Sequence, residues 1–470
     1  MAPRPGWTLA LLALSQLITS LDFFIVYVAL PDIGSDLGFS AQTLQWVASA
    51  YAVAYGGFLL LGGRAADLLG HRRMFVSALV LFAVSSLAGG LAEHQALLVA
   101  ARAVQGLGGA LLFPATLALV NTRFAEGPAR NRALGVWSGA GASGLALGSL
   151  LGGLLTAAWG WEAVFYVNVP LAVVAVAGAY ALIPPDGGRG PRRRFDLPGA
   201  VLATGGVSLL AFVLIQGPES GWGSPPILGG ALLAAVLLVA FVSVERRGAD
   251  PLMPLRMFGN RSLSSAIAVI LVFGATFNAL PYFLTVYFQN VLGYGAVATG
   301  LAFLVPSLLI AFGTQLGGRL AGRIGMRATL LIGTIGGAAG TGLLAFGVSA
   351  GGSYWEVLPG IVVMGVSQGL TWTGMWIAAA AGVPAGEQGV ASGLASSALQ
   401  VGSALGLAVL VVVAGLAEAS GAAVASGLRT AVFVAAAGMV AGAAVALTFA
   451  KKRAAEPESA EAAPVFPSTI

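Results

Sequence analysis

The chain contains no cysteine, which excludes disulfides, thiolate metal ligands and thiol nucleophiles. Its only histidines are His71 and His94, too few for a metal cluster. Charged residues make up 9% of the chain, whereas a soluble domain carries about 25%. Hydrophobic residues make up 58% and the mean hydropathy is +0.91. This composition predicts a membrane protein that spans the bilayer many times and holds no metal.

The apolar residues fall into runs separated by short polar breaks. A helix needs roughly 17–25 apolar residues to cross a bilayer. Runs near or above that length occur at 8–30, 44–62, 74–92, 97–120, 133–157, 162–183, 197–216, 226–244, 263–288, 297–316, 328–347, 355–380, 390–414 and 428–449. The sequence therefore predicts an all-α membrane protein with fourteen transmembrane helices.

The basic residues lie on one side of these predicted spans. If the N-terminus is cytoplasmic, every lysine and arginine except Arg102 and Arg429 falls in a cytoplasmic segment. The positive-inside rule then places both termini in the cytoplasm, with the protein in the inner (plasma) membrane. This sorting accounts for the net charge of +5, so a nucleic-acid partner has no support. The basic run 192–194 is interpreted either as a topology signal or as a contact with anionic lipid.

Two segments repeat along the chain in the same order. The sequence GRAADLLGHR at Gly63–Arg72 aligns without a gap with GRLAGRIGMR at Gly318–Arg327. A second pair, Gln105-Gly106-Leu107 and Gln368-Gly369-Leu370, has nearly the same offset. We therefore predict two six-helix repeats, with two helices inserted between them. Two such repeats around a central site are typical of transporters.

The repeat predicts four regions. They are an N-terminal six-helix half at 1–183, two inserted helices with cytoplasmic linkers at 184–261, a C-terminal six-helix half at 262–450, and a tail at 451–470. The tail has no apolar periodicity and is predicted to be disordered.

Four local patterns resemble the major facilitator superfamily, in particular its fourteen-helix drug:proton antiporter branch. The first is Leu21 to Pro31 at the end of span 1, and the second is the loop after span 2 with Gly63, Asp67, Gly70, Arg72 and Arg73. The third is Arg102 to Gly109 in span 4, and the fourth is the span 5 pattern with Gly144, Gly148, Gly152 and Gly153. The chain departs from the usual patterns at Phe24 and Tyr27, where that branch usually has Thr and Asn, and at Ser149, which replaces a usual proline. The resemblance implies proton-coupled drug efflux, and a loop around Asp67 that acts as a gate favouring the outward-facing state.

Asp22 and Arg102 are charged residues inside predicted spans. At 1.5 Å per residue, both lie roughly 8–12 Å below the outer surface. An ionisable group in hydrocarbon usually faces a cavity and takes part in transport or proton relay. We expect Asp22 to be the proton-coupling and cation-sensing group, with Arg102 setting its affinity. The alternatives are a purely structural Asp22–Arg102 pair, or a pair between Arg102 and Glu162.

Residues on the same helices extend this prediction. Gln105 shares a helical face with Arg102 and is a candidate to line the cavity. The glycines at 144, 148 and 152 form a small-residue stripe, which we expect to pack between the two halves. A carboxylate such as Asp67 is favourably placed at the N-terminus of a neighbouring helix. The alternative is that its loop is a tight glycine turn whose charged residues only set the membrane topology.

In the second half, candidate cavity residues are amides and aromatics at helical spacing. Gln368 and Trp372 are four residues apart, as are Asn278 and Tyr282. Aromatics beside single amides suit an adaptable apolar pocket. A core or membrane-interface role is the alternative for each, and Trp376 in particular is close to the predicted cytoplasmic end of its span.

These residues predict a proton-driven exporter of hydrophobic, neutral or singly cationic drugs or antibiotics that works by alternating access. No G-x-x-x-x-G-K-[ST] loop is present, so ATP is not expected as a partner. No cofactor is expected either, because the proton gradient supplies the energy, and the chain is not expected to be an enzyme. We expect protons, the drug and membrane lipid as partners of a monomer. The alternatives are a proton-coupled transporter of another small solute and a transport-inactive sensor or scaffold.

Overall fold

The structure, a computed structural model, describes residues 5–186, 196–248, 253, 255–415 and 422–449. Within these residues it is helical throughout and has no strand. The predicted tail at 451–470 and the basic run at 192–194 lie outside the described residues, and so does the side chain of Ser149.

The N-terminal half is built from eight helices, two of which are single turns. Their bounds are α1 Pro5–Asp36, α2 Ala41–Leu44, α3 Trp46–Leu69, α4 His71–Gly90, α5 Gln95–Arg123, α6 Pro128–Trp159, α7 Ala163–Tyr166 and α8 Asn168–Leu182. In this half α1 packs along α6, and α5 lies against both α3 and α4.

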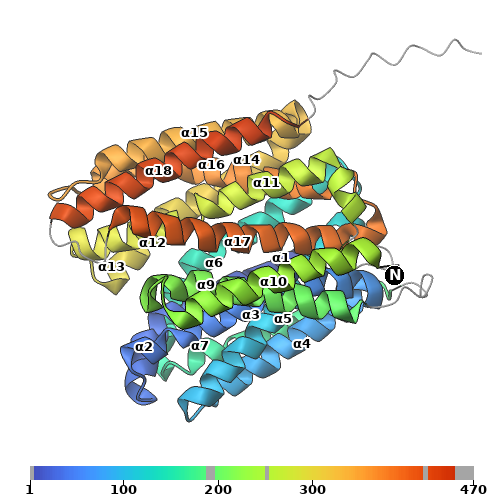
Figure 1. The fold of residues 1–470 in the computed structure, drawn as a ribbon, viewed down its shortest axis with the longest axis horizontal. Coiled ribbons are helices and arrows are strands. Elements are labelled where there is room, and N and C mark those ends of the chain that lie inside the picture. Colours follow the sequence, from blue (N-terminus) through green and yellow to red (C-terminus); the bar gives the residue numbers. More distant parts are fainter. Residues whose placement is uncertain (1–4, 187–195, 249–252, 254, 416–421, 450–470) are drawn as a thin grey trace, which may run out of the picture.

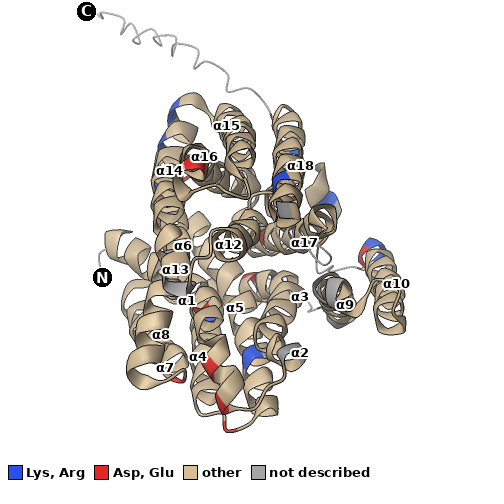
Figure 2. Cartoon of the chain, turned by 90° about the vertical axis from the view of Figure 1, so that its left-hand side faces the viewer, with Lys and Arg blue, Asp and Glu red and all other residues tan. Residues whose placement is uncertain are grey.

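Two long helices follow before the C-terminal half begins. They are α9 Leu197–Ser220 and α10 Pro225–Arg247. They pack on each other, and α9 also contacts α3 and α17. Viewed nearly along the helix axes, the two helices lie to one side of the bundle (Figure 2).

The C-terminal half contains α11 Arg261–Ala275, α12 Leu280–Val286, α13 Ala296–Ala302, α14 Leu304–Ile324, α15 Met326–Gly347, α16 Tyr354–Ala380, α17 Gln388–Ala414 and α18 Ala422–Ala446. Short 3-10 turns at Leu255–Gly259 and Ala385–Glu387 and a π-turn at Tyr287–Val291 connect them. In Figure 1 this half forms the upper layer and the N-terminal half the lower one, with the long helices running roughly from side to side.

The two halves have the same pattern of helix contacts. The contacts of α1 with α6 and of α3 with α5 correspond to those of α11 with α17 and of α14 with α16. The halves meet where α3 crosses α17 and where α14 crosses α6, which are corresponding helix pairs in the repeat. The structure therefore has a pseudo-twofold arrangement.

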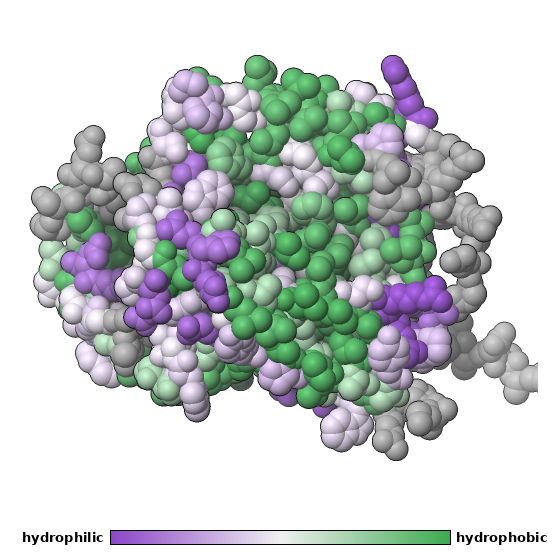
Figure 3. Space-filling view, turned by 90° about the horizontal axis from the view of Figure 1, so that it is seen from below, coloured by the Kyte–Doolittle hydropathy of each residue, from purple (hydrophilic) through white to green (hydrophobic). Residues whose placement is uncertain are grey.

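The exterior suits a bilayer. Figure 3 shows a broad hydrophobic surface across the middle of one face, with hydrophilic residues near its two ends. Twelve helical segments of the described chain are long and apolar enough to cross a membrane. The two other predicted spans coincide with α6 and α9, whose apolar stretches are shorter, at Leu150–Trp159 and Pro198–Leu214. The count of fourteen is not established by this criterion.

One predicted helical face is absent. Asn278 and Tyr282 were expected four residues apart on one helix, but the chain turns between the end of α11 at Ala275 and the start of α12 at Leu280. Pro281 lies at the start of α12; a proline has no N–H to donate and disfavours helical geometry at the preceding residue. The prediction of a shared face is therefore wrong.

Candidate functional site

Asp22 and Arg102 form an ion pair in the interior of the N-terminal half. A nitrogen of the Arg102 guanidinium lies 2.8 Å from the Asp22 carboxylate. Asp22 has no exposed surface, and Arg102 is 1% exposed. The pair joins α1 to α5. Arg102 therefore pairs with Asp22 and not with Glu162, the alternative partner.

The Asp22 carboxylate accepts two further hydrogen bonds from neutral amides. Gln105 donates to it at 2.7 Å and Asn168 at 2.8 Å. The hydroxyl of Ser86 accepts from both amides at 3.1 Å and donates to the carbonyl of Phe165. A buried carboxylate is stable only when paired and hydrogen-bonded, and here five helices contribute to that shell or to its support. We call Asp22, Arg102, Gln105, Asn168 and Ser86 the buried network.

Arg102 has its own supporting contacts. Its Nε donates to the carbonyl of Val47 at 3.0 Å, and its Nη1 donates to Gln105 at 2.7 Å. The guanidinium carbon lies 4.4 Å from the centroid of the Tyr51 ring. The planar guanidinium can therefore bind the carboxylate and stack on an aromatic ring at once. These contacts hold the Arg102 side chain in the position from which it pairs with Asp22.

Glycines on α5 bring the neighbouring helices close enough for these contacts. A Cβ at Gly106 would lie 2.4 Å from the carbonyl oxygen of Tyr51, and one at Gly108 would lie 3.0 Å from the backbone nitrogen of Phe82. The first distance is too short for a side chain, and the second would require the backbone of α4 to shift slightly. The motif after Arg102 thus sets the approach of α3 and α4 to α5, on which the geometry of the buried network depends.

Two members of the buried network were not predicted from the sequence. Asn168 begins α8, two residues before Pro170, and Ser86 lies four residues before the end of α4. A single amide in an apolar run was the available signal for Asn168. A serine in a transmembrane helix gives no such signal, because its hydroxyl is commonly satisfied by the backbone of its own helix.

The glycine stripe of α6 packs within the N-terminal half, so the expectation that it lies between the halves is wrong. A Cβ at Gly144 would lie 2.3 Å from the Cβ of Ser20, and one at Gly148 or Gly152 would also meet α1 within 3.0 Å. Gly153 is different, because its nearest neighbour would be 4.0 Å away. The stripe therefore holds α6 against the helix that carries Asp22.

Asp67 connects the two halves. Its carboxylate oxygens accept hydrogen bonds of 2.9 Å from the backbone N–H groups of Gly389 and Val390, in the first turn of α17. It also contacts His71 at 3.1 Å. Beside it, the helices touch through glycine, since a Cβ at Gly63 would lie 2.2 Å from the carbonyl oxygen of Gly389. A carboxylate at a helix N-terminus is favourably placed by charge and by hydrogen bonding.

The remaining loop residues hold α4 in place. Gly70 has φ of +102°, which favours glycine. The Asp186 carboxylate accepts hydrogen bonds of 3.0 Å from the backbone N–H groups of Arg72 and Arg73 at the start of α4. The Arg72 guanidinium also lies 4.8 Å from the centroid of the Tyr180 ring. Arg72 and Arg73 thus contribute through their backbone as well as through their charge.

Aromatic side chains from both halves meet near the middle of the molecule. Phe113 and Trp137 lie 5.2 Å apart, and Trp376 from the other half lies 5.5 Å from Phe113. Trp376 is fully buried, so its alternative role at the membrane interface is wrong. Trp372 extends the cluster, 5.6 Å from Trp376.

The other predicted cavity residues are dispersed. Asn278 is exposed and donates to Ser403 at 3.1 Å. Tyr282 is 43% exposed, and Gln368 is 9% exposed. Gln105 was a candidate substrate contact, but its amide is instead fully used inside the buried network. The structure therefore does not bring these four residues together with Trp372 into one pocket.

The sequence and the fold both match known transporters. The profile of the Major Facilitator Superfamily matches residues 12–407. The chain belongs to the Major Facilitator Superfamily. It is a multi-pass membrane transporter by family and fold, rather than an enzyme.

Relatives of the chain include antibiotic resistance and export proteins. The puromycin resistance protein pur8 of Streptomyces alboniger is 39% identical over 414 residues, which is 87% of this chain and 82% of that protein. The cephamycin export protein CmcT of Amycolatopsis lactamdurans is 39% identical over 413 residues, 87% of this chain and 84% of that protein. The crystal structure of the human organic anion transporter MFSD10 (TETRAN) superposes with a TM-score of 0.70 at 18% identity, covering 94% of this chain and 100% of that one. This structural likeness shows the fold alone.

Proposed function

We propose that this protein exports a hydrophobic, neutral or singly cationic drug or antibiotic in exchange for protons. The observation that carries the proposal is the buried Asp22 carboxylate, held by Arg102, Gln105 and Asn168. The antibiotic resistance and export roles of the relatives support the substrate class. The proton gradient would supply the energy, so the transporter would need no cofactor and no ATP.

The buried network offers a route to a protonated state. As a carboxylate, Asp22 accepts bonds from three donors. A protonated Asp22 must instead donate one bond, and the Oδ1 atom of Asn168 is buried without a hydrogen-bond partner. Rotation of the Asn168 amide would present this acceptor to the new proton. Protonation would weaken the hold on Arg102 and so free α1 to move relative to α5.

The halves are closed against each other at the end that carries the two arginine-rich loops. Asp67 joins α3 to α17 there, and Gln315 on α14 donates to the carbonyl of Gly135 on α6 at 2.9 Å. The positive-inside rule makes this end cytoplasmic, so these contacts would close the cytoplasmic side of the transporter. The Asp67 contact would act as a latch that must break before the transporter opens inward.

The substrate class follows from the shortage of charge in the second half. Its acidic residues, among those described, are Glu356 at the start of α16 and Glu387 just before α17. Glu387 is paired with Arg256. Beside the contact between the halves, Trp372 packs 5.6 Å from Trp376 and 5.5 Å from Phe273. Such aromatic surroundings with little acidic charge would suit a hydrophobic molecule with at most one positive charge.

We further propose fourteen spans, with both termini in the cytoplasm of a monomer in the plasma membrane. α6 has 32 residues and α9 has 24, which correspond to about 48 Å and 36 Å of helix. Both exceed the ~30 Å thickness of the hydrocarbon core. Adding α6 and α9 to the twelve segments gives fourteen spans. In this arrangement α9 and α10 are the inserted pair of the fourteen-helix antiporter branch.

Toxicity assays in a host that lacks its own drug pumps test the proposal. We expect the intact chain to raise the tolerated concentration of a hydrophobic antibiotic, and a protonophore to abolish that protection. Asp22→Asn should abolish it as well. Asp32→Asn is the matched control, because Asp32 lies on the same helix but is exposed. Protection that survives the protonophore and Asp22→Asn alike would contradict proton coupling, and no protection from any compound would favour a sensor or another solute.

A further inference from the structure

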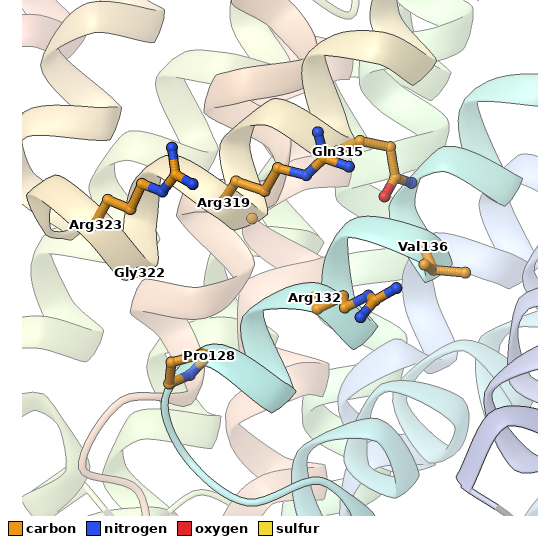
Figure 4. Close-up of a pocket in the computed structure, with 8 residues that line it drawn as sticks. Pro128, Arg132, Val136, Gln315, Arg319, Gly322 and Arg323 are labelled. Atoms are coloured by element: carbon orange, nitrogen blue, oxygen red, sulfur yellow. The ribbon is translucent and has the colours of Figure 1, made fainter.

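A pocket lies between α6 and α14 at the arginine-rich end, away from the buried network. It has a volume of about 550 Å³ and is lined by Pro128, Arg132, Val136, Gln315, Gly318, Arg319, Gly322 and Arg323. Figure 4 shows Arg319 and Arg323 on α14, and Arg132 with Pro128 on α6. The pocket thus gathers three guanidinium groups from the two halves, and none of its lining residues is acidic.

This pocket corresponds by the repeat to the site of Asp67. Where α3 crosses α17, which we call the first crossing, Gly63 approaches the carbonyl of Gly389 and the Cα of Gly393. Where α14 crosses α6, the second crossing, Gly318 approaches the carbonyl of Asn131 and the Cα of Gly135 in the same way. The alignment of the two loops pairs Gly63 with Gly318, and therefore pairs Asp67 with Gly322. In both crossings a glycine contacts the facing backbone. Four positions after that glycine, the first crossing has Asp67 and the second has Gly322.

The missing carboxylate leaves space beside hydrogen-bond donors. A Cβ at Gly322 would have the Asn131 amide nitrogen as its nearest neighbour, at 4.0 Å. Asn131 is 8% exposed. It corresponds to Gly389, whose backbone N–H donates to Asp67 in the first crossing. Where the first crossing has its own anion, the second has a cavity with an amide, three arginines and no anion among its lining residues.

We propose that the pocket between α6 and α14 binds a phosphate group, which does for this crossing what Asp67 does for the other. Arginine binds phosphate oxygens with paired, charge-assisted hydrogen bonds, and basic pockets between membrane helices at a cytoplasmic surface suit phosphorylated headgroups. Because Arg132 and Arg319 belong to different halves, a phosphate between them holds those halves together. Its binding stabilises the state that is closed at the arginine-rich end.

A cysteine reporter tests this in the full chain, which has no cysteine of its own. Thr314 on α14 is fully buried, and its hydroxyl would lie 3.2 Å from a Cβ at Gly139 on α6. Thr314→Cys should therefore react with a water-soluble maleimide only when the crossing opens. We expect a phosphate group to slow labelling at least fivefold, the lower end of typical couplings between a ligand and a conformational equilibrium.

Two arms distinguish the source of the phosphate. One uses protein in dodecyl maltoside micelles, which contain no phosphate, with added inorganic phosphate, and with sulfonate-buffered salt of equal ionic strength as the reference. The other uses the same micelles with phosphatidylglycerol added and without free phosphate. Slower labelling in the first arm identifies free phosphate as a ligand, and slower labelling in the second identifies the lipid headgroup. No slowing in either arm overturns the proposal.

Variants separate this site from a general charge effect. Arg132→Gln with Arg319→Gln should remove the slowing, whereas Arg429→Gln, which lies against Phe346 and Phe433, should keep it. Gly322→Asp supplies the carboxylate of the first crossing, so labelling should be slow without phosphate and insensitive to it. Equal slowing in the double arginine variant overturns the proposal.

The acidic tail is the competing occupant, since it carries Glu456, Glu458 and Glu461 and follows Phe449, whose carbonyl accepts a hydrogen bond from Arg327. Changing these three glutamates to glutamine should leave the phosphate effect intact. If that variant instead opens the crossing and phosphate no longer closes it, the pocket belongs to the tail and the proposal is overturned.

Discussion

The two halves of this transporter share a pattern of helix contacts but differ in their polar chemistry. The N-terminal half holds a buried carboxylate at Asp22 and a second one, Asp67, at its crossing with the other half. The C-terminal half has aromatic side chains near the centre, and glycine at position 322 where the repeat places Asp67. The two halves therefore keep the same helix contacts, while the carboxylates of Asp22 and Asp67 belong to the N-terminal half.

The largest effect is expected from removing one charge of the buried pair. Arg102→Leu would leave Asp22 without its cation, at a cost of about 3–5 kcal/mol of stability. Thermal unfolding of purified protein would measure it. Asp22→Asn combined with Arg102→Gln should recover much of that loss, because no unpaired charge remains. If the double variant were as unstable as Arg102→Leu, the pair would not be the source of the effect.

A second substitution tests the glycine contact that holds α6 on α1. Gly144→Ala places a methyl group where Ser20 already lies and should destabilise the protein by about 1–3 kcal/mol. Gly153→Ala is the matched control on the same helix, because it has space and should be neutral or slightly stabilising. Equal unfolding temperatures for the two variants would contradict the packing that we describe.

The sequence singled out Asp22 and Arg102 and placed them at one depth, because charge in an apolar run is conspicuous and helical rise fixes its depth, but it left open whether the two residues pair. It also predicted the resemblance to the family, since Gly63 to Arg73 and Arg102 to Gly109 are local patterns. It did not predict that Asp67 would bind α17. That contact joins residues more than three hundred positions apart, and nothing in a local pattern specifies it.

Two further limits have equally physical causes. The glycine stripe of α6 showed that a helix would pack closely, but small residues are equally suited to any partner helix, so α1 could not be chosen over the other half. Likewise, spacing alone placed Asn278 and Tyr282 on one face. Pro281 between them was the signal that the helix is interrupted there.

The third prediction concerns the crossing that Asp67 closes. Asp67→Asn removes the negative charge from two charge-assisted hydrogen bonds at the start of α17, with an expected cost of about 1.5–3 kcal/mol. The α3–α17 crossing should open more often. Maleimide labelling of Ser392→Cys, a buried position on α17, would measure the opening. Glu93→Gln, a carboxylate at an exposed turn, should leave labelling unchanged.

The smallest effect is expected at Asn168. Asn168→Leu removes one neutral hydrogen-bond donor from the Asp22 carboxylate, while the bonds from Arg102 and Gln105 remain. We expect a loss of about 1–1.5 kcal/mol of stability, the size of one hydrogen bond. Thermal unfolding of purified protein would measure it. An unfolding temperature equal to that of the intact chain would exclude Asn168 from a role in holding the carboxylate.

The most direct test of the account is drug-driven proton movement through the purified protein. In proteoliposomes without a pre-set pH gradient, an imposed drug gradient should drive protons in the opposite direction, and a trapped pH indicator should report them. We predict that the intact chain and Asp32→Asn give this signal, and that Asp22→Asn binds drug but moves no protons. Drug-driven proton flux that persists in Asp22→Asn would contradict the assignment of coupling to Asp22.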